Sequence, residues 1–344
     1  MLEIPYDLGV QECIETQVQT LLETAVPVPQ PEGIVPGVQE VERIASLLVD
    51  AQRPLLLAGR GAMSAAADVI RFADYLHADA ATSAPAQGLF NSEGVFRDLG
   101  ICGGFASKGG GAEIALADVV LVIDAGHNPF TLSFGQAFNP AATVIPIDVT
   151  DQAICARVDY FLRGSVHATV PALLSALQAK EFLAPARLSP CPKVKDHDKG
   201  DALAPDGGHF IGWANTHLDV PAADNMVLLG TTTQSIGLGF SFVVGLAAAA
   251  GKEQMTVLVN GAAYGAEIHQ YATKGVSAAP MLIPEVNFAR LLSALGARAT
   301  VIHTLEDLAD FRAWVDSQET GTYVLDCRVS HEIIAPFMQE LMAR

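Results

Sequence analysis

The sequence predicts an α/β protein with two open parallel-sheet, Rossmann-like domains, the second of them shortened. Short apolar runs alternate with amphipathic segments, which is the pattern of strands and crossover helices in a parallel sheet. Half of the residues are hydrophobic, which suits large buried sheets. A chain of 344 residues exceeds one ordinary core, so we expect about two domains.

The first segment has the composition of a linker. Residues 24–37 contain four prolines and two glycines. The opening MLEIPYDLGVQE has neither the basic nor the apolar region of a signal peptide. We therefore assign residues 1–37 to a first segment that ends in this linker, and we expect a cytoplasmic protein.

Residues 38–182 are predicted to form the first α/β domain. Val41, Ile44 and Leu48 fall on one face of a helix. The run Pro54–Ala58 is continuously apolar, as in a strand buried on both faces. The pattern continues as helix, strand, helix, strand, strand and helix near residues 65–77, 78–83, 110–117, 119–123, 142–147 and 168–179.

A second proline-containing linker is expected at residues 183–206. The second domain, residues 207–344, is predicted to be α/β as well, although it is small for a doubly wound sheet. Its strands are expected at residues 226–229, 255–259, 300–302 and 322–326, and its helices at residues 237–250, 287–295 and 305–317.

Charge and cysteine content exclude several classes of protein. A net charge of −18 and the lack of a basic stripe argue against nucleic acid and anionic membranes as partners. No apolar run approaches the roughly 20 residues of a membrane span. Five scattered cysteines favour reduced thiols over a disulfide framework.

Candidate ligand-binding loops follow three strands of the first domain. Gly59, Arg60 and Gly61 precede a helix, where glycines let backbone amides approach a phosphate. Their spacing only approximates the dinucleotide fingerprint, so a dehydrogenase is a weaker alternative and a tight turn without ligand is at least as well supported. Asp124 and Asp148 follow two further strands, at the sheet edge where ligands bind. These loops are candidates for FAD or ADP binding, with helix capping as the alternative.

In the second domain, a glycine pair and a histidine would place backbone groups and an imidazole near an anion. A later loop leads into a helix rich in small residues. Its glycines would allow a ligand to approach closely, although close packing is the commoner reason for glycines in a helix. The sequence has no G-x-S-x-G elbow and no G-K-[ST] motif, so neither a serine hydrolase nor a P-loop is predicted. The candidates in this domain are Gly207, Gly208, His209, Gln234, Ser235, Ile236 and Gly237.

The motifs resemble those of a known family in their order along the chain. They are LEIPYDL, RPLLLAGRGA, TSAPAQGLFNSEG, LADVVLVIDA, VIPIDVTDQAI, DGGHFIGWAN, GTTTQSIGLGF and NGAAYGAEIHQY. This series resembles thiamine-diphosphate-dependent enzymes of the acetolactate synthase and benzoylformate decarboxylase type. Such enzymes have a pyrimidine-binding domain, a central domain that holds FAD or ADP in some members, and a diphosphate-binding domain. The resemblance implies decarboxylation or carboligation of 2-oxo acids with thiamine diphosphate and Mg²⁺.

The resemblance also implies departures from the family pattern. Residues 2–8 resemble the closing strand of a pyrimidine domain whose catalytic glutamate has no counterpart, so no catalytic residue is assigned. The aspartate of the G-D-G metal motif has no counterpart either. The second metal-ligand position falls on Gly261, which leaves Asn260 as the candidate metal residue. By resemblance, Gly207–His209 contact the diphosphate and Gln234–Gly237 support the cofactor.

We therefore expect that the chain alone does not catalyse the family reaction. It would act in a homo-oligomer or with a chain that supplies the pyrimidine domain, on a small 2-oxo acid. The alternative is a non-catalytic FAD- or ADP-binding or association module.

Overall fold

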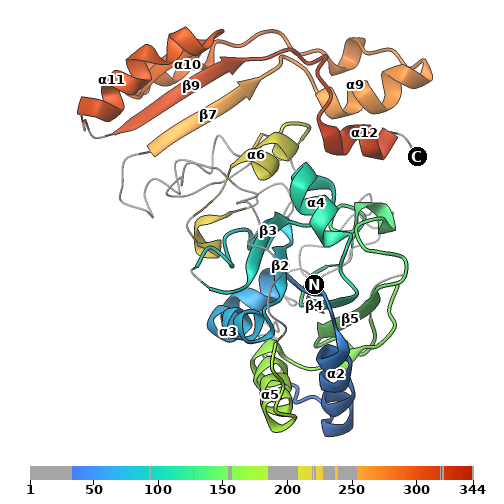
Figure 1. Cartoon of the computed structure of the whole chain (residues 1–344). Coiled ribbons are helices and arrows are strands. Elements are labelled where there is room, and N and C mark those ends of the chain that lie inside the picture. Colours follow the sequence, from blue (N-terminus) through green and yellow to red (C-terminus); the bar gives the residue numbers. More distant parts are fainter. Residues whose placement is uncertain are drawn as a thin grey trace, which may run out of the picture.

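The structure is a computed structural model, which describes residues 33–92, 94–126, 128–153, 157–184, 208–218, 220, 222–227, 237–238, 254–317, 319 and 321–342. This part of the chain forms two open parallel sheets, one of six strands and one of three (Figure 1). The predicted α/β class is confirmed. Most of the two predicted linkers and most of the predicted helix 237–250 lie outside the described residues.

The larger sheet has the strand order β3-β2-β1-β4-β5-β6, and all its neighbouring strands are parallel. The direction of winding reverses between β1 and β4, so the loops after these strands meet at the carboxyl edge. The strands are β1 (Pro54–Ala58), β2 (Asp79–Thr82), β3 (Arg97–Ile101), β4 (Val119–Ile123), β5 (Thr143–Asp148) and β6 (Leu162–Arg163).

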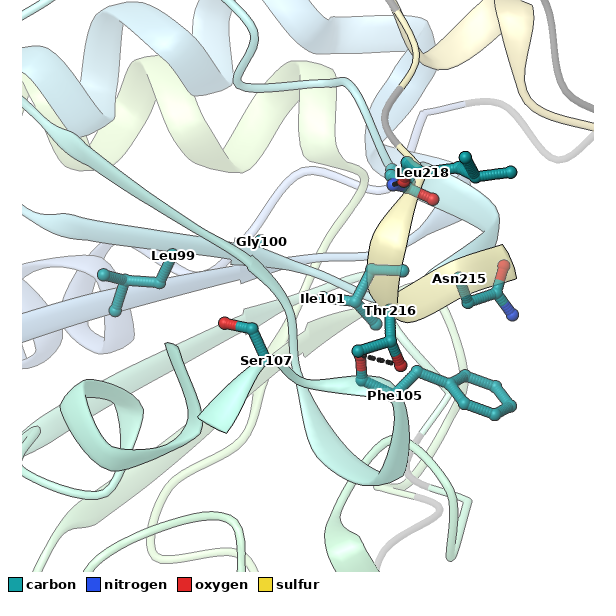
Figure 2. Close-up of a pocket in the computed structure, with 9 residues that line it drawn as sticks. Leu99, Gly100, Ile101, Phe105, Ser107, Asn215, Thr216 and Leu218 are labelled. Atoms are coloured by element: carbon teal, nitrogen blue, oxygen red, sulfur yellow. Dashed lines mark hydrogen bonds between the residues drawn. The ribbon is translucent and has the colours of Figure 1, made fainter. Parts of the chain in front are cut away.

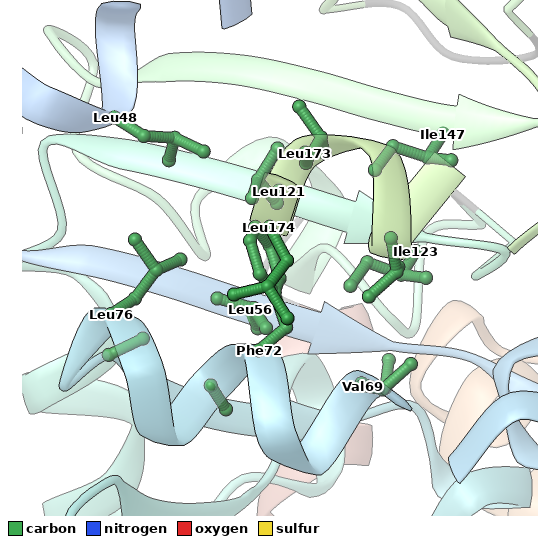
Figure 3. Packing of buried hydrophobic residues seen from close by; sticks show 14 of the residues in the cluster. Leu48, Leu56, Val69, Phe72, Leu76, Leu121, Ile123, Ile147, Leu173 and Leu174 are labelled. Carbon is green, nitrogen blue, oxygen red and sulfur yellow. The ribbon is translucent and has the colours of Figure 1, made fainter. Parts of the chain in front are cut away.

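Both faces of this sheet are buried, because successive side chains along each strand enter opposite cores. Leu56 and Leu121 face the core that α2, α3 and α5 cover, where Phe72 is fully buried (Figure 3). Leu55 faces the other core, to which Ile114 of α4 contributes. The helices are α2 (Val38–Asp50), α3 (Ala66–Leu76), α4 (Lys108–Ile114) and α5 (Val166–Ala179).

The smaller sheet has the order β7-β9-β8, again with parallel neighbours. Its core contains Trp314, Tyr323 and Leu325. The strands are β7 (Gln254–Asn260), β8 (Arg298–Ile302) and β9 (Thr322–Arg328). The helices of this part are α6 (Ile211–His217), α9 (Gly265–Tyr271), α10 (Phe288–Ser293), α11 (Ala309–Ser317) and α12 (Pro336–Met342).

Aromatic side chains connect the two parts of the described fold. Phe105, in the turn after β3, packs edge-on against Phe337 of α12 with ring centroids 5.1 Å apart. Ile211 and Trp213 of α6 join the same apolar cluster. Helices α6 and α12 therefore lie next to the carboxyl end of β3. None of the described helices combines the length and apolarity needed to cross a membrane.

Candidate cofactor-binding site

The loops predicted to bind a nucleotide meet at the carboxyl edge of the larger sheet. Gly59 follows β1, Asp124 follows β4 and Asp148 ends β5. The Gly59 N–H donates to the carbonyl of Ile123 at 2.8 Å, so the turn after β1 packs on the end of β4. A Cβ at Gly59 would lie 1.9 Å from the carbonyl oxygen of Asp124, and one at Gly61 would lie 1.9 Å from its carboxylate. Close packing against Asp124 therefore accounts for both glycines.

Asp124 makes this turn acidic. Burial and then the negative charge of Asp148 raise the pKa of the Asp124 carboxyl, while the positive charge of Arg60 opposes the rise. A bound phosphate would meet the same two carboxylates, and the Arg60 that could offset them is exposed. The structure thus brings the predicted residues together, but their charges disfavour a diphosphate at this turn.

Asn260, the candidate metal residue, is the last residue of β7. Its Nδ2 donates to the carbonyl of Val286 at 3.0 Å and to the carboxylate of Asp326 at 3.2 Å. Its Oδ1 accepts the backbone N–H of Ala262 at 3.3 Å. Because the nitrogen makes both donor contacts, the amide oxygen is oriented toward Ala262.

Asp326 is the centre of the polar contacts around β7 and β9, and sequence reasoning predicted it only as a strand residue. Its side chain is 0% exposed. It accepts the N–H groups of Phe288 and Ala289, which begin α10, at 2.9 and 3.3 Å. Arg328 donates to it at 2.7 Å. The carboxylate therefore joins β9, β7 and the start of α10, and its charge is paired as a buried charge requires.

Gly261 and Ala262 lie in the loop after β7, which other parts of the fold contact closely. Gly261 offers a carbonyl but no side chain, and His331 Nδ1 lies at hydrogen-bonding distance from that carbonyl, 3.2 Å. A Cβ at Gly261 would lie 3.3 Å from the ring of Phe210. The carbonyl of Ala262 accepts the N–H of Ile283 at 2.9 Å. Protein groups thus contact this loop on several sides.

His209 is buried beside the same loop and is 3% exposed. Its Nε2 accepts the backbone N–H of Ala335 at 2.8 Å. A ring nitrogen that accepts carries no proton, so the imidazole is neutral with its proton on Nδ1. Burial, followed by the charge of His269, lowers the pKa of His209 to about 4. The two rings lie 4.9 Å apart between centroids.

These contacts allow a test of whether the described residues fit a magnesium-bound diphosphate. Mg²⁺ prefers six oxygen ligands, usually including one or two carboxylates. Asn260 offers one amide oxygen, which already accepts an N–H, and Gly261 has no side chain. His209 uses its Nε2 lone pair to accept a backbone N–H, whereas its buried Nδ1–H has no hydrogen-bond partner among the described groups and could donate to an anion. Within the described ranges, no three His, Cys, Asp or Glu side chains are grouped so that they could hold a metal ion. The described residues do not fit a bound magnesium ion.

Several predicted cofactor residues lie outside the described part of the chain. Of the described ones, Gly208 and Gly237 have φ of +100° and +94°, in the left-handed region that favours glycine. The roles assigned to all of these residues stay predictions, as does metal binding by Asn260. The residues outside the described ranges are Gly207, Gln234, Ser235 and Ile236.

The part of the chain that contains the larger sheet is similar to a known protein family. Residues 41–173 match the family model described as thiamine pyrophosphate enzyme, central domain. This match begins in α2, ends in α5 and contains all six strands of the sheet. The doubly wound part of the chain is therefore similar to the central domain of thiamine pyrophosphate enzymes, as the resemblance implied. No curated protein matches the sequence.

Solved structures extend the similarity beyond this domain. Benzoylformate decarboxylase from Polynucleobacter necessarius is similar with a TM-score of 0.61 and 14% identity, over 90% of this chain and 68% of that one. A protein from Mycobacterium smegmatis described as a thiamin diphosphate-dependent enzyme has a TM-score of 0.57 and 17% identity, over 88% and 66%. The chain thus spans about two thirds of each structure, and at these identities the likeness concerns the fold.

Proposed function

We propose that this chain is a thiamine-diphosphate enzyme homologue of the acetolactate synthase type that does not, as a single chain, decarboxylate or ligate 2-oxo acids. The observation that carries the proposal is the position of Asn260. Its amide is held by Asp326 and by the carbonyl of Val286, and its oxygen accepts the N–H of Ala262. The residue expected to contact the metal is used instead to join two strands and a loop.

The chemistry of the neighbouring groups supports the same proposal. The diphosphate group carries negative charge that Mg²⁺ and hydrogen-bond donors normally balance. His209 is neutral above about pH 4 and contributes no positive charge. Turning Asn260 toward a metal would remove one of the partners of the buried Asp326 carboxylate. Loss of such a partner is costly because the charge is shielded from water.

In the proposed role, the chain associates with another protein chain and does not itself catalyse a reaction. Val257 and Val259 of β7 are 46% and 42% exposed, and Leu282 beside the loop after β7 is 50% exposed. Neighbouring exposed apolar side chains commonly mark interaction surfaces. In this proposal the chain forms a homo-oligomer or binds a chain that supplies the pyrimidine-side residues, and any catalysis on a 2-oxo acid occurs in that complex.

Calorimetric titration of the full chain with thiamine diphosphate, with and without Mg²⁺, tests this function. We expect no Mg²⁺-dependent binding and no release of CO₂ from pyruvate or benzoylformate. Magnesium-dependent binding with a micromolar Kd would overturn the proposal. Asn260→Ala is the matched variant: loss of such binding together with an unchanged unfolding temperature would identify Asn260 as a ligand, whereas a lowered unfolding temperature would reflect the lost contact with Asp326.

The same titration with ADP, FAD and NAD tests the larger sheet. The carboxylates of Asp124 and Asp148 at the turn after β4 lead us to expect no tight binding of any of the three. Binding of ADP or FAD would instead favour a nucleotide-binding module, and binding of NAD would favour a dehydrogenase. Light scattering of the same samples measures the oligomeric state.

A further inference from the structure

A small cavity lies where the carboxyl end of β3 meets helix α6 (Figure 2). Ile101 and Phe105 line it from the first domain, and Asn215 and Thr216 line it from α6. The hydroxyl of Thr216 donates to the carbonyl of Phe105 at 3.3 Å, which is the dashed line in Figure 2. The cavity is therefore part of the contact that holds α6 against the first domain.

Gln87 brings a buried polar atom to this cavity. Its side chain is 1% exposed, and its Nε2 donates to the carbonyl of Leu218. A carbonyl can only accept, so this contact fixes which end of the amide is nitrogen and places Oε1 at the other end. Oε1 has no hydrogen-bond partner among the described groups. In native proteins such atoms are usually paired, often by ordered water.

Asn215 contributes two more buried polar atoms that lack a hydrogen-bond partner. It is 3% exposed, and neither its Oδ1 nor its Nδ2 has a hydrogen-bond partner among the groups that the structure describes. Gln87 and Asn215 line the same cavity from opposite sides of the domain contact. The site thus combines two acceptors and one donor, which a molecule able both to donate and to accept would satisfy.

The size and lining of the cavity define the occupant. About 10 Å³ is open to the centre of a water-sized molecule. A water needs on the order of 10–15 Å³ by this measure and two to four polar partners. None of the side chains that line the cavity is charged. The space is too small for an organic ligand, and the neutral lining favours a neutral molecule.

We propose that this cavity binds one ordered water molecule, which hydrogen-bonds Gln87 Oε1 and the side-chain amide of Asn215. The water joins the segment after β2 to α6. Together with the contact from Gln87 to Leu218 and that from Thr216 to Phe105, it fixes the C-terminal end of α6 on the first domain.

A crystal structure of the full chain at a resolution that shows ordered water tests the proposal directly. We expect one water at hydrogen-bonding distance from Gln87 Oε1 and from an amide atom of Asn215. An empty cavity would overturn the proposal. A direct hydrogen bond between the two side chains would overturn it as well.

A pair of isosteric variants tests the energetic role of the water. Asn215→Leu removes both polar atoms of Asn215, so a bridging water would be lost and Gln87 Oε1 left unpaired. We expect the unfolding temperature to fall by about 2–4 °C. Thr169→Val is the control, because Thr169 Oγ1 is buried without a partner in the described fold but lines no part of this cavity. We expect that variant to be unchanged or stabilised.

In a dry cavity, Asn215→Leu would behave like Thr169→Val, since replacing an unpaired buried amide by an apolar group relieves its desolvation cost. An unchanged or raised unfolding temperature for Asn215→Leu would therefore contradict the proposal. If that variant does not fold, the crystal structure of the unaltered chain decides.

Discussion

Acidification should destabilise the part of the fold around His209, and a substitution at this residue should remove much of the effect. His209 accepts the N–H of the fully buried Ala335, directly before α12. Protonation of Nε2 would convert the acceptor to a donor and leave that N–H without a partner. Phe337 of α12 packs in the same cluster, so the damage would reach this helix.

The size of the stability loss on acidification follows from the lowered pKa of His209. The pKa of His209 is about 4 in the fold and 6.5 in the reference state. The unfolded chain therefore binds the proton more readily, so stability is complete above about pH 6.5 and declines as the pH falls toward 4. Between pH 7.5 and 5.0 the expected loss is about 2 kcal/mol, and below pH 4 it approaches about 3 kcal/mol. Burial is the main reason that the pKa of His269 is lowered as well. Protonation of His269 therefore also reduces stability at low pH.

Urea unfolding followed by tryptophan fluorescence at pH 7.5 and 5.0 measures this loss, since Trp213 lies in the same cluster. His209→Gln keeps an acceptor near the position of Nε2 but does not titrate. We expect its loss between the two pH values to be smaller than that of the unaltered chain by about 2 kcal/mol. The same substitution at the exposed His167 is the control for the chemical change from His to Gln. A His209→Gln variant with the pH dependence of the unaltered chain would refute the reasoning.

Three further changes test packing and burial elsewhere in the fold. Gly61→Ala should cost about 1–3 kcal/mol in urea unfolding, because its Cβ would lie 1.9 Å from the Asp124 carboxylate, and Asp124→Gly in the same chain should restore stability. Asp326→Ala should cost about 3–5 kcal/mol by the same assay, because Arg328 and the N–H groups that begin α10 lose their buried acceptor although Arg328 keeps its pair with Glu285, and a cost under about 1 kcal/mol would contradict that account. Cys102 should resist alkylation at pH 8 in the folded chain, as measured by mass spectrometry, since it is 1% exposed and burial raises its pKa to about 12; rapid labelling in the native state would be inconsistent with this burial.

The buried strands of the larger sheet could be predicted because they are continuously apolar. The run at residues 119–123 coincides with β4, and Pro54–Ala58 coincides with β1. Strand β3 was not predicted, since it begins with Arg97 and Asp98. Its start is held by the pair between Arg97 and Asp79 of β2, whose atoms lie 2.6 Å apart. That partner is distant in sequence, so no local pattern shows the pairing.

The structure brings residues of the candidate site together, but their contacts could not be predicted from the sequence. Sequence order placed His209 and Asn260 in the second domain, and the structure brings both close to Phe210 and Gly261. Sequence alone placed the His209 imidazole near an anion but did not show that its Nε2 accepts a hydrogen bond from Ala335. The partner of Asn260 is 66 positions away, so only the parallel pairing of β7 with β9 explains it. Local spacing carries no signal for such a contact.

The hydrogen bond between Asn260 and Asp326 has an evolutionary consequence. A new side chain at position 261 would meet Phe210, and it would still leave the Asn260 amide bonded to the buried carboxylate. A metal ligand at Asn260 would therefore have to use the amide oxygen in the orientation that this bond fixes, because turning the amide would require a replacement partner for Asp326. Single substitutions that free the amide from Asp326 pass through a less stable protein, because they leave a buried charge with one partner fewer. The hydrogen bond therefore favours the present orientation of the Asn260 amide over any other.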